Sequence, residues 1–158
     1  MPSSDQALRL DNQLCFALYR ASRALIRAYT PLLEQLGLTY PQYLTLLVLW
    51  EEDDLTVSAL GERLALDSGT LTPLLKRLEV HGSIERHRDT ADERVVHIRL
   101  TQAGKSLKVK ARKVPPAMAC RAGFDLALPD DNARLHQLRE GLRILTQDLE
   151  RTYQAEHT

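Results

Sequence analysis

Apolar residues recur every three or four positions near both ends of the 158-residue chain, which predicts long amphipathic helices there. The first such segment runs from about residue 11 to 35. Asp11 or Asn12 is placed to cap its start, and Gly37 is placed to end it. The last segment runs from about residue 130 to 153 and carries one stripe of leucines. A stripe of this length on a terminal helix predicts a partner surface.

The middle of the chain predicts a helix-turn-helix. Residues 40–50 are apolar on nearly every side, so this helix should be central and buried. Two short helices follow it. Thr56 is placed to cap the first of them, Asp67 or Ser68 to cap the second, and Gly82 to end the second. The second member of such a pair is the DNA-reading helix, called the reader helix below.

Two short strand-like runs come next, over 84–87 and 94–100, on either side of the polar loop 88–93. A helix-turn-helix followed at once by a β-hairpin is a winged helix. Thr101 is then placed to cap a basic helix, and Pro115–Pro116 should bend or break that helix.

These elements predict a mainly α-helical fold class with a small β-hairpin wing. The winged helix-turn-helix would span residues 40–101. The N- and C-terminal helices, 11–36 and 102–153, would form a helical dimerisation region. A composition that is 44% hydrophobic but only 5% aromatic fits a helical core built from aliphatic side chains.

Charge and cysteine content narrow the function classes. Lys plus Arg equals Asp plus Glu at 21 each, so any affinity for nucleic acid must come from local clusters. The N-terminal residues have no signal-peptide pattern, and we expect a cytoplasmic protein in which a structural disulfide is disfavoured. No apolar run approaches the roughly 20 residues of a membrane span, so no membrane partner is expected.

The reader helix combines inward-facing leucines with outward-facing hydroxyl and basic groups, which match phosphate oxygens and base edges in the major groove. The candidate DNA contacts are Ser68, Thr70, Thr72, Lys76 and Arg77. An ordinary amphipathic surface helix would show the same pattern, and that alternative stays open.

The hairpin carries three further candidate DNA contacts, Arg86, Arg88 and Arg94. Arginines on a protruding arm suit insertion into a narrow minor groove, where the negative potential is strongest. Asp92 could fold back on a backbone amide or on an arginine and fix the shape of the loop. A solvated hairpin with incidental charges is the alternative.

The stretch from Leu55 to Gly104 resembles the MarR family of transcription regulators. The resemblance is carried by the reader segment SGTLTPLLKRL and by Asp92-Glu93-Arg94 ahead of Leu100-Thr101-Gln102-Ala103-Gly104. It implies a homodimer, formed by the two ends of the chain, that binds a pseudo-palindromic operator in double-stranded DNA with one winged helix on each half-site.

Cys15 falls in the first turn of the first helix, where the free N–H groups and the positive end of the helix dipole favour a thiolate. Tyr19 and Tyr29 share a broad face with it at roughly 100° per residue, and Tyr40 adds a third phenol. Tyr29 is roughly 21 Å farther along the axis, so only an antiparallel partner helix would bring it near Cys15. A small buried cysteine among core tyrosines would look the same.

Nearly the whole chain resembles the organic hydroperoxide regulator (OhrR) subfamily, in its two-cysteine type. The matching segments are Asp11–Tyr19, Tyr29 and Leu38–Tyr43. The resemblance implies that Cys15 is the peroxidatic sensor and that Tyr29 and Tyr40 donate hydrogen bonds to it. It also implies that Cys120 resolves the sulfenic acid of Cys15 as a disulfide, from the other subunit.

The sequence thus predicts a repressor of organic-hydroperoxide resistance genes, not an enzyme, that leaves its operator when a hydroperoxide oxidises Cys15. Two alternatives stay open: a MarR-type regulator that responds to a small phenolic ligand, and a thiol peroxidase that uses Cys15. We expect no cofactor and no metal, because the histidines do not cluster with the cysteines at ligand spacing. These histidines are His81, His87, His97, His136 and His157.

Overall fold

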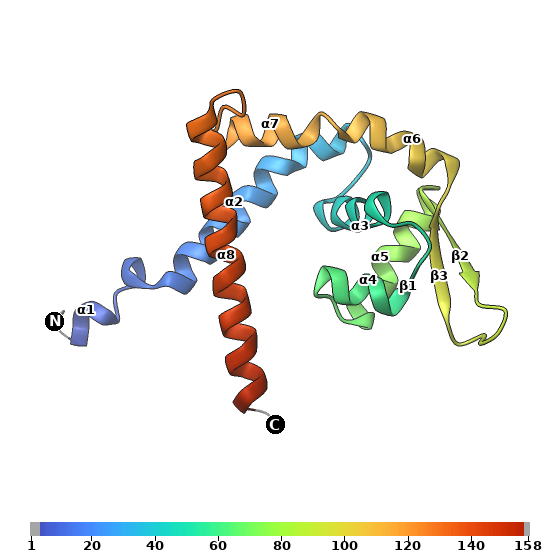
Figure 1. Cartoon of the computed structure of the whole chain (residues 1–158), viewed down its shortest axis with the longest axis horizontal. Coiled ribbons are helices and arrows are strands. Elements are labelled where there is room, and N and C mark those ends of the chain that lie inside the picture. Colours follow the sequence, from blue (N-terminus) through green and yellow to red (C-terminus); the bar gives the residue numbers. More distant parts are fainter. Residues whose placement is uncertain (1–3, 157–158) are drawn as a thin grey trace. The chain divides into compact units, whose positions relative to one another are not determined.

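The computed structural model describes residues 4–156 and is mainly α-helical with a hairpin wing, as the sequence predicts, and the hairpin belongs to a small three-stranded sheet (Figure 1). Its elements in order are α1 (Ser4–Ala7), the 3₁₀ turn η1 (Leu10–Asn12), α2 (Leu14–Glu34), α3 (Tyr40–Glu51), β1 (Leu55–Thr56), α4 (Val57–Leu64), α5 (Ser68–Val80), β2 (Ile84–Arg88), β3 (Val96–Leu100), α6 (Gln102–Ala111), α7 (Val114–Arg121) and α8 (Pro129–Glu156). None of the helices in the described range is long and apolar enough to cross a membrane. The chain divides after Val114 into two compact units.

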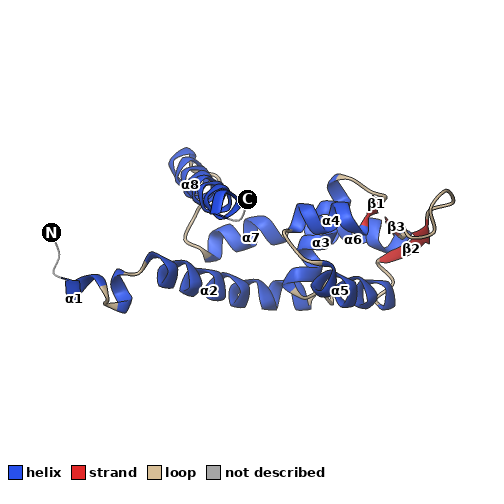
Figure 2. Cartoon of the chain, turned by 90° about the horizontal axis from the view of Figure 1, so that it is seen from below, coloured by secondary structure: helices blue, strands red, loops and turns tan. Residues whose placement is uncertain are grey.

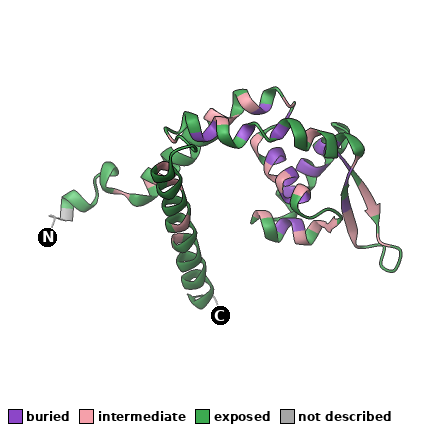
Figure 3. Ribbon diagram, turned by 45° about the horizontal axis from the view of Figure 1, so that its top comes forward, coloured by how far each residue is buried: buried purple, intermediate pink, exposed green. Residues whose placement is uncertain are grey.

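The core of the first unit lies among α3, α4, α5 and the sheet, where the buried residues gather (Figure 3). The prediction that the leucines of the reader helix, α5, pack inward is confirmed, because Leu71, Leu75 and Leu78 are all at most 1% exposed. Each such side chain contributes about 1.5–3 kcal/mol by leaving water. Helix α3 is buried on several sides, as expected for a central helix.

Three predicted helix caps are confirmed. The Thr56 hydroxyl accepts a hydrogen bond from the Ala59 amide at 3.1 Å, and the Asp67 carboxylate accepts one from the Thr70 amide at 2.9 Å. The Thr101 hydroxyl accepts one from the Gly104 amide at 3.1 Å. These bonds pair N–H groups that the first turn of a helix leaves without partners, so α4, α5 and α6 begin where the sequence predicts.

Glycines end two helices, also as predicted. Gly37 has φ +67°, and the Leu38 amide donates to the Leu33 carbonyl at 3.1 Å, which closes a Schellman motif after α2. Gly82 has φ +78° directly after α5. Both positions need a left-handed backbone conformation that glycine adopts without a Cβ clash.

The predicted start of the first long helix is wrong. Helix α2 begins at Leu14 after the cap residue Gln13, and neither Asp11 nor Asn12 caps it. Asn12 belongs instead to η1, and its Nδ2 donates to the Gln6 carbonyl at 2.7 Å. The side chain therefore serves the turn before it rather than the helix after it.

The sheet has the order β1-β3-β2 and is antiparallel throughout. The hairpin pairs Ile84 with Leu100 and Arg88 with Val96, and it extends beyond the helices as a wing (Figure 2). The sequence did not predict β1, which pairs Leu55 with Ile98. The second strand starts at Val96 rather than at residue 94, because the Val95 amide is bonded to Asp92 within the loop.

Helix α6 starts in close contact with the turn between α5 and β2. A Cβ placed on Gly104 would lie 2.0 Å from the Ser83 carbonyl oxygen, so only glycine fits. The Thr101 amide donates to the same oxygen at 3.1 Å. The wing and α6 are therefore anchored together at this junction.

The second unit contains α7 and α8. The predicted helix break is confirmed, because α6 ends at Ala111 and the two prolines lie in the first turn of α7. The loop before α8 is ordered by the Asp131 carboxylate, which accepts from the Asp125 amide at 2.9 Å. Helix α8 carries exposed apolar residues, among them Leu138, Leu142 and Leu149, and has no buried residue (Figure 3).

Gly104→Ala should lower the free energy of unfolding by at least about 2 kcal/mol, because the added methyl group overlaps a backbone carbonyl that cannot move aside. Ser106→Ala, two residues along the same helix and exposed, should change it by less than about 0.5 kcal/mol. Urea denaturation of both variants measures the difference. Equal stabilities would mean that the close approach of α6 to Ser83 is not a constraint.

Candidate nucleic-acid interface and thiol site

The five candidate DNA contacts on α5 lie on its exposed face, opposite the buried leucines. The Thr72 hydroxyl donates to the Ser68 carbonyl at 2.7 Å, and the Thr70 hydroxyl donates to the Asp67 carboxylate at 2.9 Å. The lone pairs of both hydroxyl oxygens remain available as acceptors. Lys76 and Arg77 add positive charge to the same face, so this face offers polar and basic groups together.

Asp67 holds the N-terminus of this face in place. Hydrogen bonds from the backbone and then the hydroxyl of Thr70 lower the pKa of the Asp67 carboxyl below its usual value. An ionised cap at the start of α5 also interacts favourably with the positive end of the helix dipole. The helix presents its first turn in one fixed conformation.

The three wing arginines have different environments. The Arg94 side chain is 95% exposed near the tip of the hairpin, and Arg88 is also exposed. Arg86 is half-buried, with its guanidinium 3.4 Å from the Thr72 carbonyl and 3.3 Å from the Glu79 carboxylate. Arg86 thus braces the wing against α5, and its role as a DNA contact stays a prediction.

The loop at the wing tip is ordered by two aspartates. The expectation that Asp92 folds back on the backbone is confirmed, because its carboxylate accepts from the Arg94 amide at 3.0 Å. Asp89, which sequence reasoning missed, accepts from the amides of Asp92 at 3.0 Å and Ala91 at 2.7 Å, and these bonds lower the pKa of its carboxyl. An aspartate that begins a polar loop is a turn signal that could have identified it.

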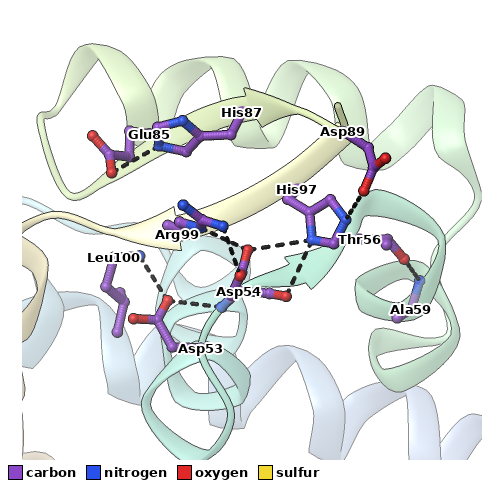
Figure 4. A network of polar contacts seen from close by, with 10 residues as sticks. All are labelled: Asp53, Asp54, Thr56, Ala59, Glu85, His87, Asp89, His97, Arg99 and Leu100. Carbon is purple, nitrogen blue, oxygen red and sulfur yellow. Dashed lines mark hydrogen bonds and ion pairs between the residues drawn. The ribbon is translucent and has the colours of Figure 1, made fainter. Parts of the chain in front are cut away.

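A polar network joins the wing to the acidic turn after α3 (Figure 4). Arg99 donates two hydrogen bonds to the Asp54 carboxylate, at 2.8 and 2.9 Å. The ring nitrogens of His97 lie 3.2 Å from Asp54 and 3.5 Å from Asp89, so the histidine stands between the turn and the wing tip. Sequence reasoning missed this network, because Asp54 lies more than forty residues from His97 and Arg99 along the chain.

Ion pairs between arginines and carboxylates also determine where positive charge remains on the surface. Residues 40–101 hold more carboxylates than basic side chains, so this region as a whole does not attract a polyanion. Much of the acidic turn is, however, neutralised: Arg63 pairs with Glu51 and Glu52, and Arg99 pairs with Asp54. The exposed face of α5 and the wing tip keep basic groups that point to solvent.

Cys15 is the second residue of α2, within the first turn that the sequence predicts for it, and its thiol is exposed and forms no disulfide within the chain. Four residues along, the Tyr19 hydroxyl oxygen accepts a hydrogen bond from Arg23 at 3.0 Å, with the guanidinium 5.5 Å from the ring centroid. The proton of the Tyr19 hydroxyl therefore remains available for donation. Cys15 and Tyr19 share one face of α2.

Tyr29 and Tyr40 are brought together, with ring centroids 4.9 Å apart, and Tyr43 lies 6.0 Å from Tyr29. Burial raises the pKa of the Tyr29 and Tyr40 phenols, and it raises that of Tyr43 to about 12. These phenols are hence protonated donors at neutral pH. They do not meet Cys15 of the same chain, because fourteen residues of the unbroken α2 separate Tyr29 from it by roughly 21 Å.

Cys120 lies on α7 in the second unit, where its exposed, free thiol lines a surface pocket with Pro116, Phe124 and Leu126. In residues 4–156, no three or more His, Cys, Asp or Glu side chains are grouped to hold a metal ion. His157 lies outside the described residues.

Comparison with known proteins gives consistent matches. The family model described as transcriptional regulator SarA/Rot matches residues 27–111. The organic hydroperoxide resistance transcriptional regulator of Bacillus subtilis (strain 168) is 49% identical over 143 residues, which are 90% of this chain and 92% of that protein.

Crystal structures of AbfR, from Staphylococcus epidermidis, are also similar. Reduced AbfR bound to DNA is 38% identical with a TM-score of 0.66, over 90% of this chain and 97% of that one. Overoxidised AbfR bound to DNA is 39% identical with a TM-score of 0.67, over 89% and 98%. Disulfide-formed AbfR is 40% identical with a TM-score of 0.60, over 87% and 95%.

Asp54→Asn should weaken the link between the acidic turn and the wing. The hydrogen bond from Arg99 lowers the pKa of Asp54, so its stabilising effect is present at neutral pH and is lost as the pH falls through that lowered pKa. The variant should therefore melt at a lower temperature at pH 7 but lose less further stability in acid than the wild type. Asparagine tolerates the positive φ of 63° at this position.

Thermal unfolding followed by circular dichroism between pH 7 and pH 3 measures this difference. Glu93→Gln removes an exposed carboxylate from the tip loop and should leave the acid profile unchanged. An Asp54→Asn profile parallel to that of the wild type would show that the pairing with Arg99 does not contribute to stability.

Proposed function

Because the chain belongs to the MarR family of winged-helix transcriptional regulators, in the subfamily of the organic hydroperoxide regulators, we propose that it is a repressor controlled by oxidation of Cys15. In this proposal the reduced homodimer occupies its operator and prevents transcription of hydroperoxide-resistance genes. Oxidation by an organic hydroperoxide then releases it. The observation that carries the proposal is an exposed thiol in the first turn of α2, in a fold that also presents a pair of protonated tyrosines.

The proposed oxidation has two balanced steps. The sulfur of Cys15 attacks one peroxide oxygen, so that an S–O bond forms, the O–O bond breaks and an alcohol leaves with the second oxygen and a proton. The thiol of Cys120 then attacks the sulfenic sulfur, a disulfide forms and water leaves. Two thiols are oxidised by two electrons in total, and one hydroperoxide is reduced to its alcohol.

A homodimer is part of the proposal because α2 and α8 expose apolar side chains that a single chain does not cover. Leu14 is 61% exposed on α2, and Leu149 is 61% exposed on α8. Exposed apolar stripes of this kind mark association surfaces. An antiparallel α2 from a second copy would also bring Tyr29 and Tyr40 of one chain toward Cys15 of the other.

Operator binding is supported by AbfR, whose structure has been solved bound to DNA in its reduced form. In the proposal, α5 enters the major groove and Arg94 enters the adjacent minor groove, once in each half-site. The contacts of α5 would come from Ser68, Thr70, Thr72, Lys76 and Arg77, and Arg88 would contact the backbone beside Arg94.

Release by a disulfide is supported by a second form of the same relative. The structure of AbfR has been solved with its disulfide formed, and also on DNA in an overoxidised form. In that protein, an overoxidised form can therefore still occupy DNA. This favours the disulfide, rather than oxygen added to sulfur, as the form that leaves the operator. In this chain, bonding Cys120 to Cys15 would displace α7, and the helix break ahead of Pro115 would let that motion turn the winged lobe.

A Cys15→Ser protein should bind the operator as tightly as the wild type and remain bound after treatment with cumene hydroperoxide. Cys120→Ser should still consume one equivalent of hydroperoxide, but it should form no intersubunit disulfide on a non-reducing gel and should be released less completely. Fluorescence anisotropy of a labelled operator, followed by the gel, measures both. Release of Cys15→Ser equal to that of the wild type would contradict the sensor role, and continuous peroxide turnover would indicate a thiol peroxidase instead.

Arg94→Ala should weaken operator binding and lower the slope of log affinity against log salt by about 2, because the homodimer loses one such contact in each half-site and two fewer phosphate-associated cations are displaced. Arg151→Ala removes the same charge from the end of α8, where Arg151 pairs with Asp148, and should leave the slope unchanged. Anisotropy titrations at several salt concentrations measure both slopes. A slope of wild-type size in Arg94→Ala would remove Arg94 from the DNA interface.

A further inference from the structure

Helix α3 connects two regions that the proposed function needs to couple. Its first residue, Tyr40, contacts Tyr29 of α2, and these are the proposed sensor phenols. Its last turn carries Trp50, the one tryptophan in the chain. The residues that follow α3 contact the wing. A single buried helix thus spans the distance from the phenol pair to the base of the wing.

Aromatic contacts follow the same face of α3 from one end toward the other. Tyr43 lies 6.0 Å from the Tyr29 ring, and it meets Trp50 edge-on with the ring centroids 6.3 Å apart. Tyr43 is only 2% exposed, so its ring has little room to turn unless its neighbours move. A change in the position of the Tyr29 ring would therefore displace the Tyr43 ring and, through it, Trp50.

At its far end α3 is bonded to the wing root, which we define as residues 100–104, the junction of β3 and α6. The Trp50 indole N–H donates to the Gly104 carbonyl at 3.0 Å, and Lys108 donates to the Trp50 carbonyl at 2.6 Å. The Asp53 carboxylate accepts from the Leu100 amide at 2.8 Å. The wing root is thus held from both sides by residues at the end of α3.

We infer that Trp50 is a positioning residue through which the state of the sensor tyrosines sets the angle of the wing. This inference rests on the proposed function. Gly104 leaves no space between α6 and Ser83, so the wing root moves as one piece with α6 rather than yielding locally. The indole N–H is the contact by which an aromatic side chain of α3 itself holds this piece, beside the bond from Lys108 to the Trp50 carbonyl. Removing it should uncouple oxidation from operator release without affecting oxidation itself.

Trp50→Phe tests the inference, because it keeps an aromatic ring against Tyr43 and removes the N–H donor together with the second ring of the indole. The quantity to measure is the ratio of operator dissociation constants, oxidised over reduced. We expect this ratio to fall by about five-fold or more, the lower end of ordinary allosteric couplings. The rate of Cys15 oxidation by cumene hydroperoxide should not change. An unchanged rate distinguishes a loss of coupling from a general destabilisation of the protein, which would be expected to alter both. A wild-type ratio in a folded Trp50→Phe protein would overturn the inference.

Ser106→Ala is the matched control. This substitution also removes one side-chain hydrogen bond from α6, the bond to the Gln102 carbonyl, but that bond does not involve α3. Its dissociation-constant ratio should equal that of the wild type. An equal loss of coupling in both variants would show that any weakening of α6 suffices, and would remove the special role of Trp50.

Trp50 emission in the unmodified protein provides a second measurement that does not depend on the variant folding. Hydroperoxide treatment should change the intensity or wavelength of the emission in step with operator release, and should leave it unchanged in Cys15→Ser. Emission that stays constant while the wild type is released would overturn the inference. Failure of the wild type to leave the operator at all would instead contradict the proposed function.

Discussion

The burial of α3 is the constraint on which the rest of the first unit depends. Its side chains at Tyr43, Leu46 and Leu49 are 2% exposed or less, so helices and strands pack against it from several directions. A close-packed helix cannot shift one end without disturbing what the other end touches. One end of α3 contacts a tyrosine of α2 and the other end holds the start of α6. The same packing that stabilises the lobe thus makes the position of the Tyr29–Tyr40 pair and that of the wing mechanically dependent on each other.

Electrostatics adds a second constraint, acting on the wing. The acidic turn after α3 is used for pairing: Asp54 holds Arg99, and His97 stands between Asp54 and Asp89. These contacts occupy carboxylates that would otherwise repel a polyanion, and they fix the strand that leads back from the wing tip. The positively charged side chain of Arg94, which is 95% exposed, projects from near the tip of the wing. A lobe with a surplus of acidic residues can in this way still present a basic reading surface.

Local chemistry explains which features could be predicted from the sequence. Each of the caps at Thr56, Asp67 and Thr101 is a hydrogen bond to an amide three residues away, and the end of α2 at Gly37 depends on one backbone dihedral angle. Because these features are local, the pattern of residues along the chain is enough to predict them. The start of α2 was mispredicted because Asn12 had two possible partners in the backbone, and periodicity does not choose between them. Strand β1 was missed because two residues are too few to show the alternating pattern of a strand, and because Ile98, with which Leu55 pairs, is distant in sequence. The packing of Tyr29 on Tyr40 and the bond from Trp50 to Gly104 likewise depend on tertiary structure. The candidate DNA contacts and the two thiols are identified by their chemistry together with the family resemblance.

The central claim is that one thiol near the start of α2 controls whether two winged helices hold DNA. The most direct test is a DNase footprint of the wild-type protein on its own upstream promoter, first reduced, then treated with one equivalent of organic hydroperoxide, then returned to dithiothreitol. We expect a two-fold symmetric footprint that disappears on oxidation and returns on reduction. A footprint that persists through oxidation, with the thiol of Cys15 demonstrably consumed, would contradict the account.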